Sequence, residues 1–208
     1  MNTVPYAFCD AVASVISAVS LPAEANTPES CFWKHAFADH HTNRIHLELY
    51  VLLVGKIWYY NLFKRRQVLN AGDRPTIMLR FGDIVSIQRK YIHLEYIELA
   101  GSDGDVVSFN ELRRIVTFLS PCVVPTAMFR AHLKNGPQKE LADLLSLLSS
   151  APFHEIAVFD CSKAFDCFLE KQIRLDTLKS FYVFGLTRLA RAWNEKYGRI
   201  RRISTMPN

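Results

Sequence analysis

The sequence predicts a mixed α+β and α/β fold in which a short helical N-terminal module and a β-hairpin precede a stack of strand–helix units. Two observations support this prediction. A short strand signature, with apolar residues at offsets 0, 3 and 5, recurs along the second half of the chain. Segments with helical periodicity lie between its copies, so strands and helices alternate. Side chains alternate between the faces of a strand, so the residues at offsets 3 and 5 share one face.

Four copies of the signature are present. They are Leu94, Ile97 and Leu99, then Val124, Ala127 and Phe129, then Phe153, Ile156 and Val158, and last Leu178, Phe181 and Val183. Units of this size cannot bury their own apolar face, so each is expected to be covered by the next. The pattern predicts that residues 76–208 form an irregular leucine-rich-repeat-like stack. The alternative is an ordinary α/β domain whose strands look alike.

Each interval between the strands carries an amphipathic helix. Ser108 and Glu111 form a Ser-x-x-Glu capping box at the start of the first one. The three apolar stripes are Leu112, Ile115, Val116 and Leu119, then Leu141, Leu144, Leu145 and Leu148, then the shorter Phe165, Phe168 and Leu169 after the candidate N-cap Ser162.

Residues 1–44 are predicted to form a helical module. Pro5 suits a first helical turn, and the helix it opens is expected to end near Pro22. Its apolar face is expected to be Phe8, Val12, Ile16 and Val19. A second helix, opened by Thr27-Pro28, has Phe32, Trp33, Ala36 and Phe37 as its apolar side.

Residues 45–75 are predicted to form a β-hairpin and a loop that bridge the module to the repeat-like region. Two β-rich runs, 46–54 and 56–63, lie on either side of Gly55. The repeat-like region then begins with a strand over 76–81 and a short helix over 83–89. The predicted parts are therefore 1–44, 45–75 and 76–208.

The net charge of +5, from 25 basic and 20 acidic residues, is local. Residues 187–208 contain six basic side chains and one acidic one, which accounts for the whole excess. The basic tail comprises Arg188, Arg191, Arg199, Arg201 and Arg202 together with Lys196. Aromatic residues among them could stack on bases, so a nucleic-acid or acidic-surface binder is one alternative. We favour a solvated terminal helix.

The sequence favours a protein that is not an enzyme and carries no metal or cofactor. Five cysteines without a Cys-x-x-Cys pair fit neither a zinc site nor a disulfide framework. His35, Asp39, His40 and His41 cluster in sequence, but only the pair spaced by four shares a helix face. Cys161 or Cys167 with His154 could be drawn as a nucleophile and base; we interpret both cysteines as small buried hydrophobes in a reducing compartment.

The segment 11–21 is apolar and is followed by Ala23-Glu24-Ala25, which resembles a signal-cleavage site. The residues before it carry no basic side chain, and Asp10 precedes the apolar run, so we expect an intracellular protein without a signal peptide. No run approaches the roughly 18 apolar residues of a membrane span.

At Val4-Pro5 through Asp10 and at Phe32-Trp33-Lys34, the chain resembles the F-box, which opens with an apolar–Pro pair and reaches a Trp–basic pair later on. With Asp39-His40-His41, Asn43-Arg44, the hairpin and the repeat-like half, it is similar to the nematode-expanded family of small F-box-like proteins. Residues 18–30 depart from the usual middle of the F-box, a Leu-x-x-Leu helix that ends in a Val-Cys pair.

The resemblance implies a substrate-recognition subunit of a cullin-type ubiquitin ligase. Its helical start would dock on the adaptor protein of the ligase, and its repeat-like half would hold an unknown target protein. The adaptor-binding residues carried over are Val4, Pro5, Phe8, Val12, Ile16 and Trp33. The alternatives are that these side chains only bury one another, and that the chain is a diverged relative without a ligase partner.

Strand alternation predicts where a target would bind. Residues at the solvent side of the predicted strands are not used by the core, so they are candidates for a recognition surface. These residues are Glu95, Glu98, Glu155, Lys179 and Ser180.

Overall fold

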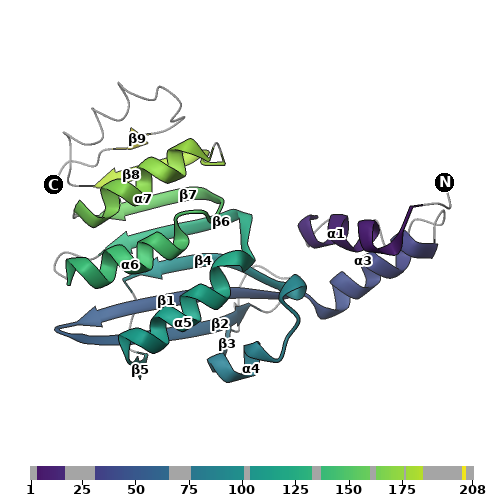
Figure 1. Ribbon diagram of the computed structural model, residues 1–208, viewed down its shortest axis with the longest axis horizontal. Helices are drawn as coiled ribbons and strands as arrows, with labels where there is room; N and C mark the ends of the chain where they lie inside the picture. The colour runs from purple at the N-terminus through teal and green to yellow at the C-terminus, as the bar shows by residue number, and fades with distance from the viewer. Residues whose placement is uncertain are drawn as a thin grey trace.

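A computed structural model describes residues 4–16, 31–65, 76–100, 104–132, 137–159, 163–175, 177–184 and 203–204. Helices α1 (Tyr6–Val15) and α3 (Cys31–Asn43) come first, a β-hairpin follows, and strands and helices then alternate. Figure 1 shows α1 and α3 projecting together from one end of the α/β body. The mixed α/β architecture predicted from the sequence is confirmed at this level.

The described strands join into one sheet. They are β1 (Ile45–Val54), β2 (Ile57–Arg65), β3 (Thr76–Leu79), β4 (Ile92–Leu99), β5 (Asp105–Val107), β6 (Val123–His132), β7 (Phe153–Phe159), β8 (Ser180–Phe184) and β9 (Ile203–Ser204). Their order is β3-β2-β1-β4-β6-β7-β8-β9, and β5 pairs with β2. Strand β1 pairs antiparallel with β2 and parallel with β4, so the sheet continues across the boundary expected at residue 75.

The hairpin prediction is confirmed. Strands β1 and β2 pair from Val54 and Ile57 outward, around a turn in which Gly55 has a φ of 64°. This left-handed conformation is open to glycine at little cost. Two short strands were not predicted from the sequence, β5 and β9. At the start of β5 a Cβ on Gly104 would lie 2.7 Å from the carbonyl oxygen of Tyr60, which explains a glycine at this close approach.

Helices α5 (Phe109–Leu119), α6 (Gln138–Leu148) and α7 (Lys163–Arg174) connect successive parallel strands. Each strand lies beside its predecessor and such crossovers are right-handed, so the three helices fall on one face of the sheet. Figure 1 shows them stacked across that face. We call it the covered face and the opposite one the open face. Short helix α4 (Phe81–Val85) and the 3-10 turns η1 (Arg89–Tyr91) and η2 (Ser120–Cys122) lead toward strands.

The predicted helical stripes form the core together with the inward strand residues. All four apolar residues of each stripe in α5 and α6 are buried, as are Phe165, Phe168 and Leu169 of α7. A row of inward residues crosses five parallel strands in register: Leu49, Ile97, Phe129, Ile156 and Phe181. The ring of Phe129 lies 5.4 Å from that of Phe153 and 4.9 Å from that of Phe168.

One copy of the strand signature is out of register. The signature aligns Ile97 with Ala127, but the structure pairs Ile97 with Phe129, two residues further on. The cause is an irregularity at the start of β6, where Pro125 has no amide hydrogen to donate to the sheet. A shift of two residues leaves every side chain on its predicted face, so the core is unaffected.

Candidate functional site

Two rows of side chains cross the open face; most of them are exposed or half-buried, whereas Asn61 and Ala157 are buried. In each row, every residue is the Cα partner of the next on the neighbouring strand. The first row is Met78, Phe63, Glu48, Tyr96, Met128, Glu155 and Ser180, and the second is Asn61, Tyr50, Glu98, Arg130, Ala157 and Tyr182. Aromatic and charged groups therefore lie side by side on this face.

Four of these residues form a compact group that we call the Tyr–Glu square: Glu48 and Tyr50 of β1 with Tyr96 and Glu98 of β4. Because β1 and β4 are parallel, Glu48 faces Tyr96 and Tyr50 faces Glu98. The Tyr50 hydroxyl donates to Glu48 Oε2 at 3.0 Å, and the Tyr96 hydroxyl donates to Glu98 Oε2 at 2.7 Å. The two tyrosine rings are 5.5 Å apart, centroid to centroid.

The structure places the predicted recognition residues in different settings. Glu98, Glu155 and Ser180 lie in the two rows of the open face. Glu95 lies at an irregularity of β4, where it accepts a hydrogen bond from His46 at 2.6 Å and pairs with Arg65 at 3.5 Å. Lys179 is exposed just before β8, and its amide donates to the carbonyl of His154.

The N-terminal helices are attached to the sheet through a polar junction. Asp10 of α1 lies 2.9 Å from Lys90 Nζ and 3.2 Å from the imidazole of His40. Burial alone would raise the pKa of the Asp10 carboxyl, but the hydrogen bonds and charges of Lys90 and His40 outweigh it and hold the pKa below its ordinary value. Burial, aided by the charge of Arg44, lowers the pKa of His40.

Arg44, at the end of α3, is buried and closes the end of α1. Its guanidinium donates to the carbonyls of Ala13 at 2.6 Å and of Ile16 at 2.7 Å. These bonds satisfy carbonyls that the helix end leaves without partners. They stabilise the end of α1 at Val15, where Ile16 turns to an extended conformation; the end near Pro22 expected from the sequence is therefore wrong. Val19, Pro22 and the start of the second helix at Thr27-Pro28 lie outside the described residues.

A cavity of about 410 Å³ lies between the end of α1 and the starts of the parallel strands. Its polar lining includes His46, His93, Glu95, Arg89 and Lys90. His93 is buried, and the rings of His46 and His93 lie 5.7 Å apart. Burial is the largest cause that lowers the pKa of His93 to about 4, so its imidazole is neutral at pH 7.

Helix α1 buries a different stripe from the one predicted. Cys9 and Ala13 are fully buried against Ala36 and Phe37 of α3, whereas Phe8 is 55% exposed. The smaller side chains let the two helices approach closely, which leaves the larger ones outside. Phe8, Val12 and Val15 follow at i, i+4 and i+7, so they form one outward stripe. The Trp33 ring packs edge-on against that of Phe8, with centroids 5.9 Å apart.

The other predicted adaptor-binding residues surround this stripe. Pro5 is exposed, and Val4, Val12, Ile16 and Trp33 are half-buried, with Val4, Ile16 and Trp33 packed against the small α1–α3 core. We call Phe8, Val12, Val15 and Trp33 the helix-pair patch.

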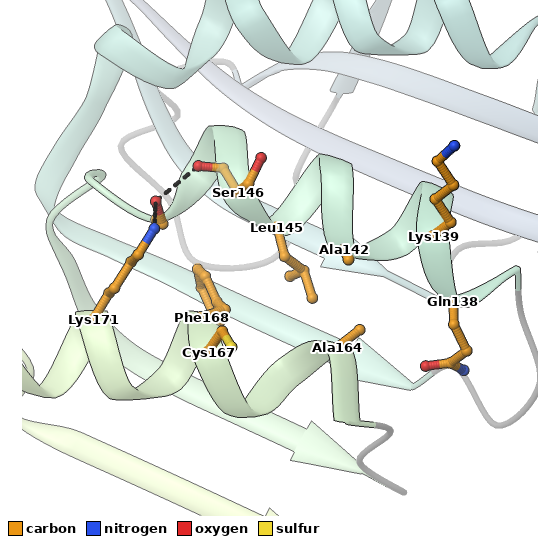
Figure 2. A pocket seen from close by; sticks show the side chains of 10 residues that line it. Gln138, Lys139, Ala142, Leu145, Ser146, Ala164, Cys167, Phe168 and Lys171 are labelled. Carbon is orange, nitrogen blue, oxygen red and sulfur yellow. Dashed lines mark hydrogen bonds between the residues drawn. The ribbon is translucent and has the colours of Figure 1, made fainter.

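A groove of about 650 Å³ lies between α6 and α7 on the covered side of the sheet. Figure 2 shows Leu145 and Phe168 at its floor and Ala142 and Ala164 along its sides. Lys171 reaches across one end, where its Nζ donates to Ser149 Oγ at 3.3 Å. The groove is mainly apolar, and it contains Cys167. This thiol is exposed, so the prediction that Cys167 is a buried hydrophobe is wrong.

The structure also places the residues weighed for catalysis and metal binding. Among the described residues, no hydrogen bond joins Cys167 to His154, and no group of three or more His, Cys, Asp or Glu side chains could hold a metal ion. His40 is buried against Asp10, whereas His35, Asp39 and His41 are exposed on α3. Cys161, Ser162 and the basic tail (Arg188, Arg191, Arg199, Arg201 and Arg202) lie outside the described residues.

Sequence reasoning identified Glu98 but missed the other members of the Tyr–Glu square. The signal was present as Glu48-Leu49-Tyr50 in one strand and the reversed order, Tyr96-Ile97-Glu98, in another. Only the parallel pairing of β1 with β4 brings the two motifs together.

Comparison of the chain with protein-family models, with curated proteins and with solved structures found no match. Among the helices that the structure describes, none has the length and hydropathy needed to cross a membrane.

Proposed function

We propose that the chain is a non-enzymatic protein-interaction receptor built on a leucine-rich-repeat-like scaffold. The open face of the sheet binds a target protein. The helix-pair patch docks on the adaptor subunit of a cullin-type ubiquitin ligase, as the resemblance to the F-box implies. The observation that carries the proposal is that two separate surfaces, one on the α1–α3 pair and one on the sheet, expose side chains suited to binding partners.

The first surface is the helix-pair patch. Its members Phe8 and Val15 are 55% and 71% exposed. Phe32 of α3, which is not a member of the patch, is a further exposed apolar residue of the helix pair, at 45%. Monomeric proteins expose few large apolar patches, and such patches mark interaction sites. Phe8 and Phe32 come from the two segments that resemble the F-box, and Val15 continues the exposed stripe of Phe8 along α1. Their exposure supports a docking role over one in which they only bury one another.

The second surface is the open face. Parallel sheets are usually covered by helices on both faces, whereas the helices that the structure describes between the parallel strands, α5, α6 and α7, all lie on one. In stacked repeats such a face presents a broad surface for binding. The outward residues of β6 illustrate this, since Met128, Arg130 and His132 are all exposed.

Binding to a purified cullin adaptor protein tests the first half of the proposal. We expect the full chain to bind the adaptor, and Phe8→Asp to abolish binding because it places a charge at the centre of the patch. Val106→Asp is the matched control, since Val106 is a 69% exposed apolar residue of β5, which lies away from α1 and α3 (Figure 1). The control is expected to bind as the unaltered chain does.

Two results would contradict the adaptor role. One is an unaltered chain that does not bind under conditions in which a standard F-box protein does. The other is a Phe8→Asp variant that binds as tightly as Val106→Asp. Either result would assign the chain to a diverged relative that keeps the scaffold without the ligase partner.

A further inference from the structure

We propose that the Tyr–Glu square and the adjoining ring of Phe63 bind a lysine side chain presented by a basic segment of the target protein. This inference rests on the proposed function, because it names the class of target for the open face. The argument uses the ring geometry, the free oxygens of the carboxylates and the charge of the surrounding rows.

Three aromatic rings from three adjacent strands provide the apolar part of the site. Tyr50 of β1 lies between Phe63 of β2 and Tyr96 of β4, with centroids 5.5 Å from each. The ring planes are inclined at 76° and 53°, so their faces do not stack flat on one another. The face of an aromatic ring attracts a cation placed within about 6 Å of its centroid.

Two carboxylates provide the charged part of the site. Glu48 is the Cα partner of both Phe63 and Tyr96, and Glu98 is the partner of Tyr50. Each carboxylate accepts a tyrosine hydroxyl on Oε2. These bonds hold the carboxylates against the rings, and each leaves Oε1 for a ligand. Burial and then the bond to Glu98 raise the pKa of Tyr96, which keeps its hydroxyl protonated as a donor.

The pattern of free oxygens favours lysine over arginine. A guanidinium pairs best with both oxygens of one carboxylate, because its parallel N–H groups form a planar fork. Here Oε2 of each carboxylate already accepts a tyrosine hydroxyl, so a guanidinium fork would have to share that oxygen, whereas the two Oε1 atoms come from neighbouring strands. An ammonium group has three donors on a compact charge, so it can bridge two separate acceptors.

The carboxylates of the square are not neutralised within the described part of the chain. Asp10, Glu95 and Glu170 form ion pairs there, whereas neither Glu48 nor Glu98 does. The two rows of the open face contain three carboxylates, including Glu155, and one guanidinium, that of Arg130. Their net charge is therefore −2, which complements a basic segment.

The surroundings suit the aliphatic part of a lysine. Met128 is the Cα partner of Tyr96 and is 37% exposed, so it extends the apolar surface beside the ring. Lysine side chains pack their methylene groups on apolar surface while the ammonium reaches a polar partner. Arg130 faces Glu98 across β4 and β6 without an ion pair between them, and it marks the edge of the site.

Titration of the full chain with blocked pentapeptides, followed by amide NMR shifts, tests the site. The probe peptide has a central lysine between glycine and serine residues; companion peptides have arginine or norleucine at that position. Low ionic strength is used because salt screens exposed charges. The lysine peptide is expected to shift amides of β1 and β4 with a millimolar dissociation constant, and to bind more tightly than either companion.

Variants of the full chain assign the binding to the square. Glu48→Gln and Glu98→Gln keep the side-chain shape and an oxygen that accepts the tyrosine hydroxyl. Each is expected to weaken lysine binding about tenfold, because each removes one charge-assisted hydrogen bond to the ammonium group. Tyr96→Leu is expected to weaken it by a similar factor. Glu155→Gln is the matched control, a carboxylate of the same face outside the square, and it should change affinity by less than about twofold.

Three outcomes would overturn the inference. They are equal binding of the norleucine peptide, equal binding of the arginine peptide, and a loss of affinity in Glu155→Gln as large as in Glu48→Gln. The amide spectrum of each variant reports whether it is folded. These outcomes are separate from failure of the proposed function, because adaptor binding through Phe8 does not involve the square and is measured independently.

Discussion

The two faces of the sheet carry different kinds of side chain in alternate positions of the same strands. In β6, Ala127, Phe129 and Ala131 are buried under the helices, whereas Met128 and Arg130 between them are exposed. On the covered face, the aromatic residues pack against other apolar side chains, as Phe129 does against Phe153 and Phe168. On the open face they lie beside carboxylates. The covered face therefore determines the fold, and the open face is free to carry a binding function.

The charged groups follow the same division. The side chains of the Tyr–Glu square project from the open face, and His46, Glu95 and Arg65 form a second polar cluster at the start of β1 and β4. Polar groups can remain there because water or another polar group satisfies them, whereas an unpaired polar group among the covered residues would cost free energy. Substitutions on the two faces are thus expected to differ in kind.

The largest expected effect is on the covered face. Phe129→Ala removes a ring that is 1% exposed and leaves a cavity between Phe153 and Phe168, so it should lower the free energy of unfolding by about 3–5 kcal/mol. Met128→Ala, one position away on the open face, should lower it by less than about 1 kcal/mol. Urea denaturation of both variants measures the difference.

Equal losses for Phe129→Ala and Met128→Ala would contradict the division between the faces. Equal losses would mean that side chains on the open face are packed as tightly as those on the covered face. A larger loss for Met128→Ala would reverse the assignment of the strand faces.

A smaller effect is expected from pH. Because the pKa of His93 falls to about 4 in the folded chain, the unfolded chain binds a proton first as the pH drops below about 6.5. Stability is therefore full above that pH and declines toward pH 4. His93 should account for about 2 kcal/mol of the loss between pH 7 and pH 5. The lowered pKa of His40 acts in the same direction.

Denaturation of His93→Gln at the two pH values isolates this contribution. The variant should lose about 2 kcal/mol less than the unaltered chain. His132→Gln serves as the control, since His132 is exposed on β6. An unchanged pH dependence in His93→Gln would show that His93 binds its proton as readily in the folded chain as in the unfolded one.

The alternation of strands and helices could be predicted from the sequence because each apolar stripe is local. In α6, for example, the stripe residues Leu141, Leu144 and Leu145 are three or four positions apart, so the helical period alone places them on one face. The register of β6 could not be predicted, since a shift of two residues keeps the same face and leaves the pattern unchanged. The apolar stripe of α1 was predicted wrongly because the small residues Cys9 and Ala13, rather than Phe8, form the contact with α3.

The candidate site could be predicted only in part. Alternation along one strand places Glu98 on the outward side, but it says nothing about which strand lies next to it. Tyr50 and Glu98 are far apart in the sequence, and they meet because β1 pairs with β4 in parallel. Such long-range pairing depends on the whole sheet, so no local pattern contains it.

A further prediction concerns a helix cap on the covered face. The Ser108 side chain accepts a hydrogen bond from the amide of Glu111 at 3.2 Å, which confirms the Ser108 half of the capping box predicted from the sequence. Ser108→Ala should lower the free energy of unfolding by about 1 kcal/mol. Ser146→Ala is the control, because Ser146 in α6 bonds back to the carbonyl of Asp143 and its loss should be nearly neutral. Equal effects would mean that the cap contributes nothing specific.

The smallest expected effect on stability comes from a substitution on the open face, Glu98→Gln, which should also change the ionisation of Tyr96. Glu98→Gln removes a charge but keeps an acceptor for the Tyr96 hydroxyl, so the free energy of unfolding should change by less than about 0.5 kcal/mol. The raised pKa of Tyr96 depends on burial and then on the bond to the Glu98 carboxylate. The variant should therefore lower that pKa, and absorbance titration of the tyrosines should detect an earlier transition. A marked loss of stability with no shift in the titration would mean that the square supports the fold, and the difference between the two faces would then be one of degree.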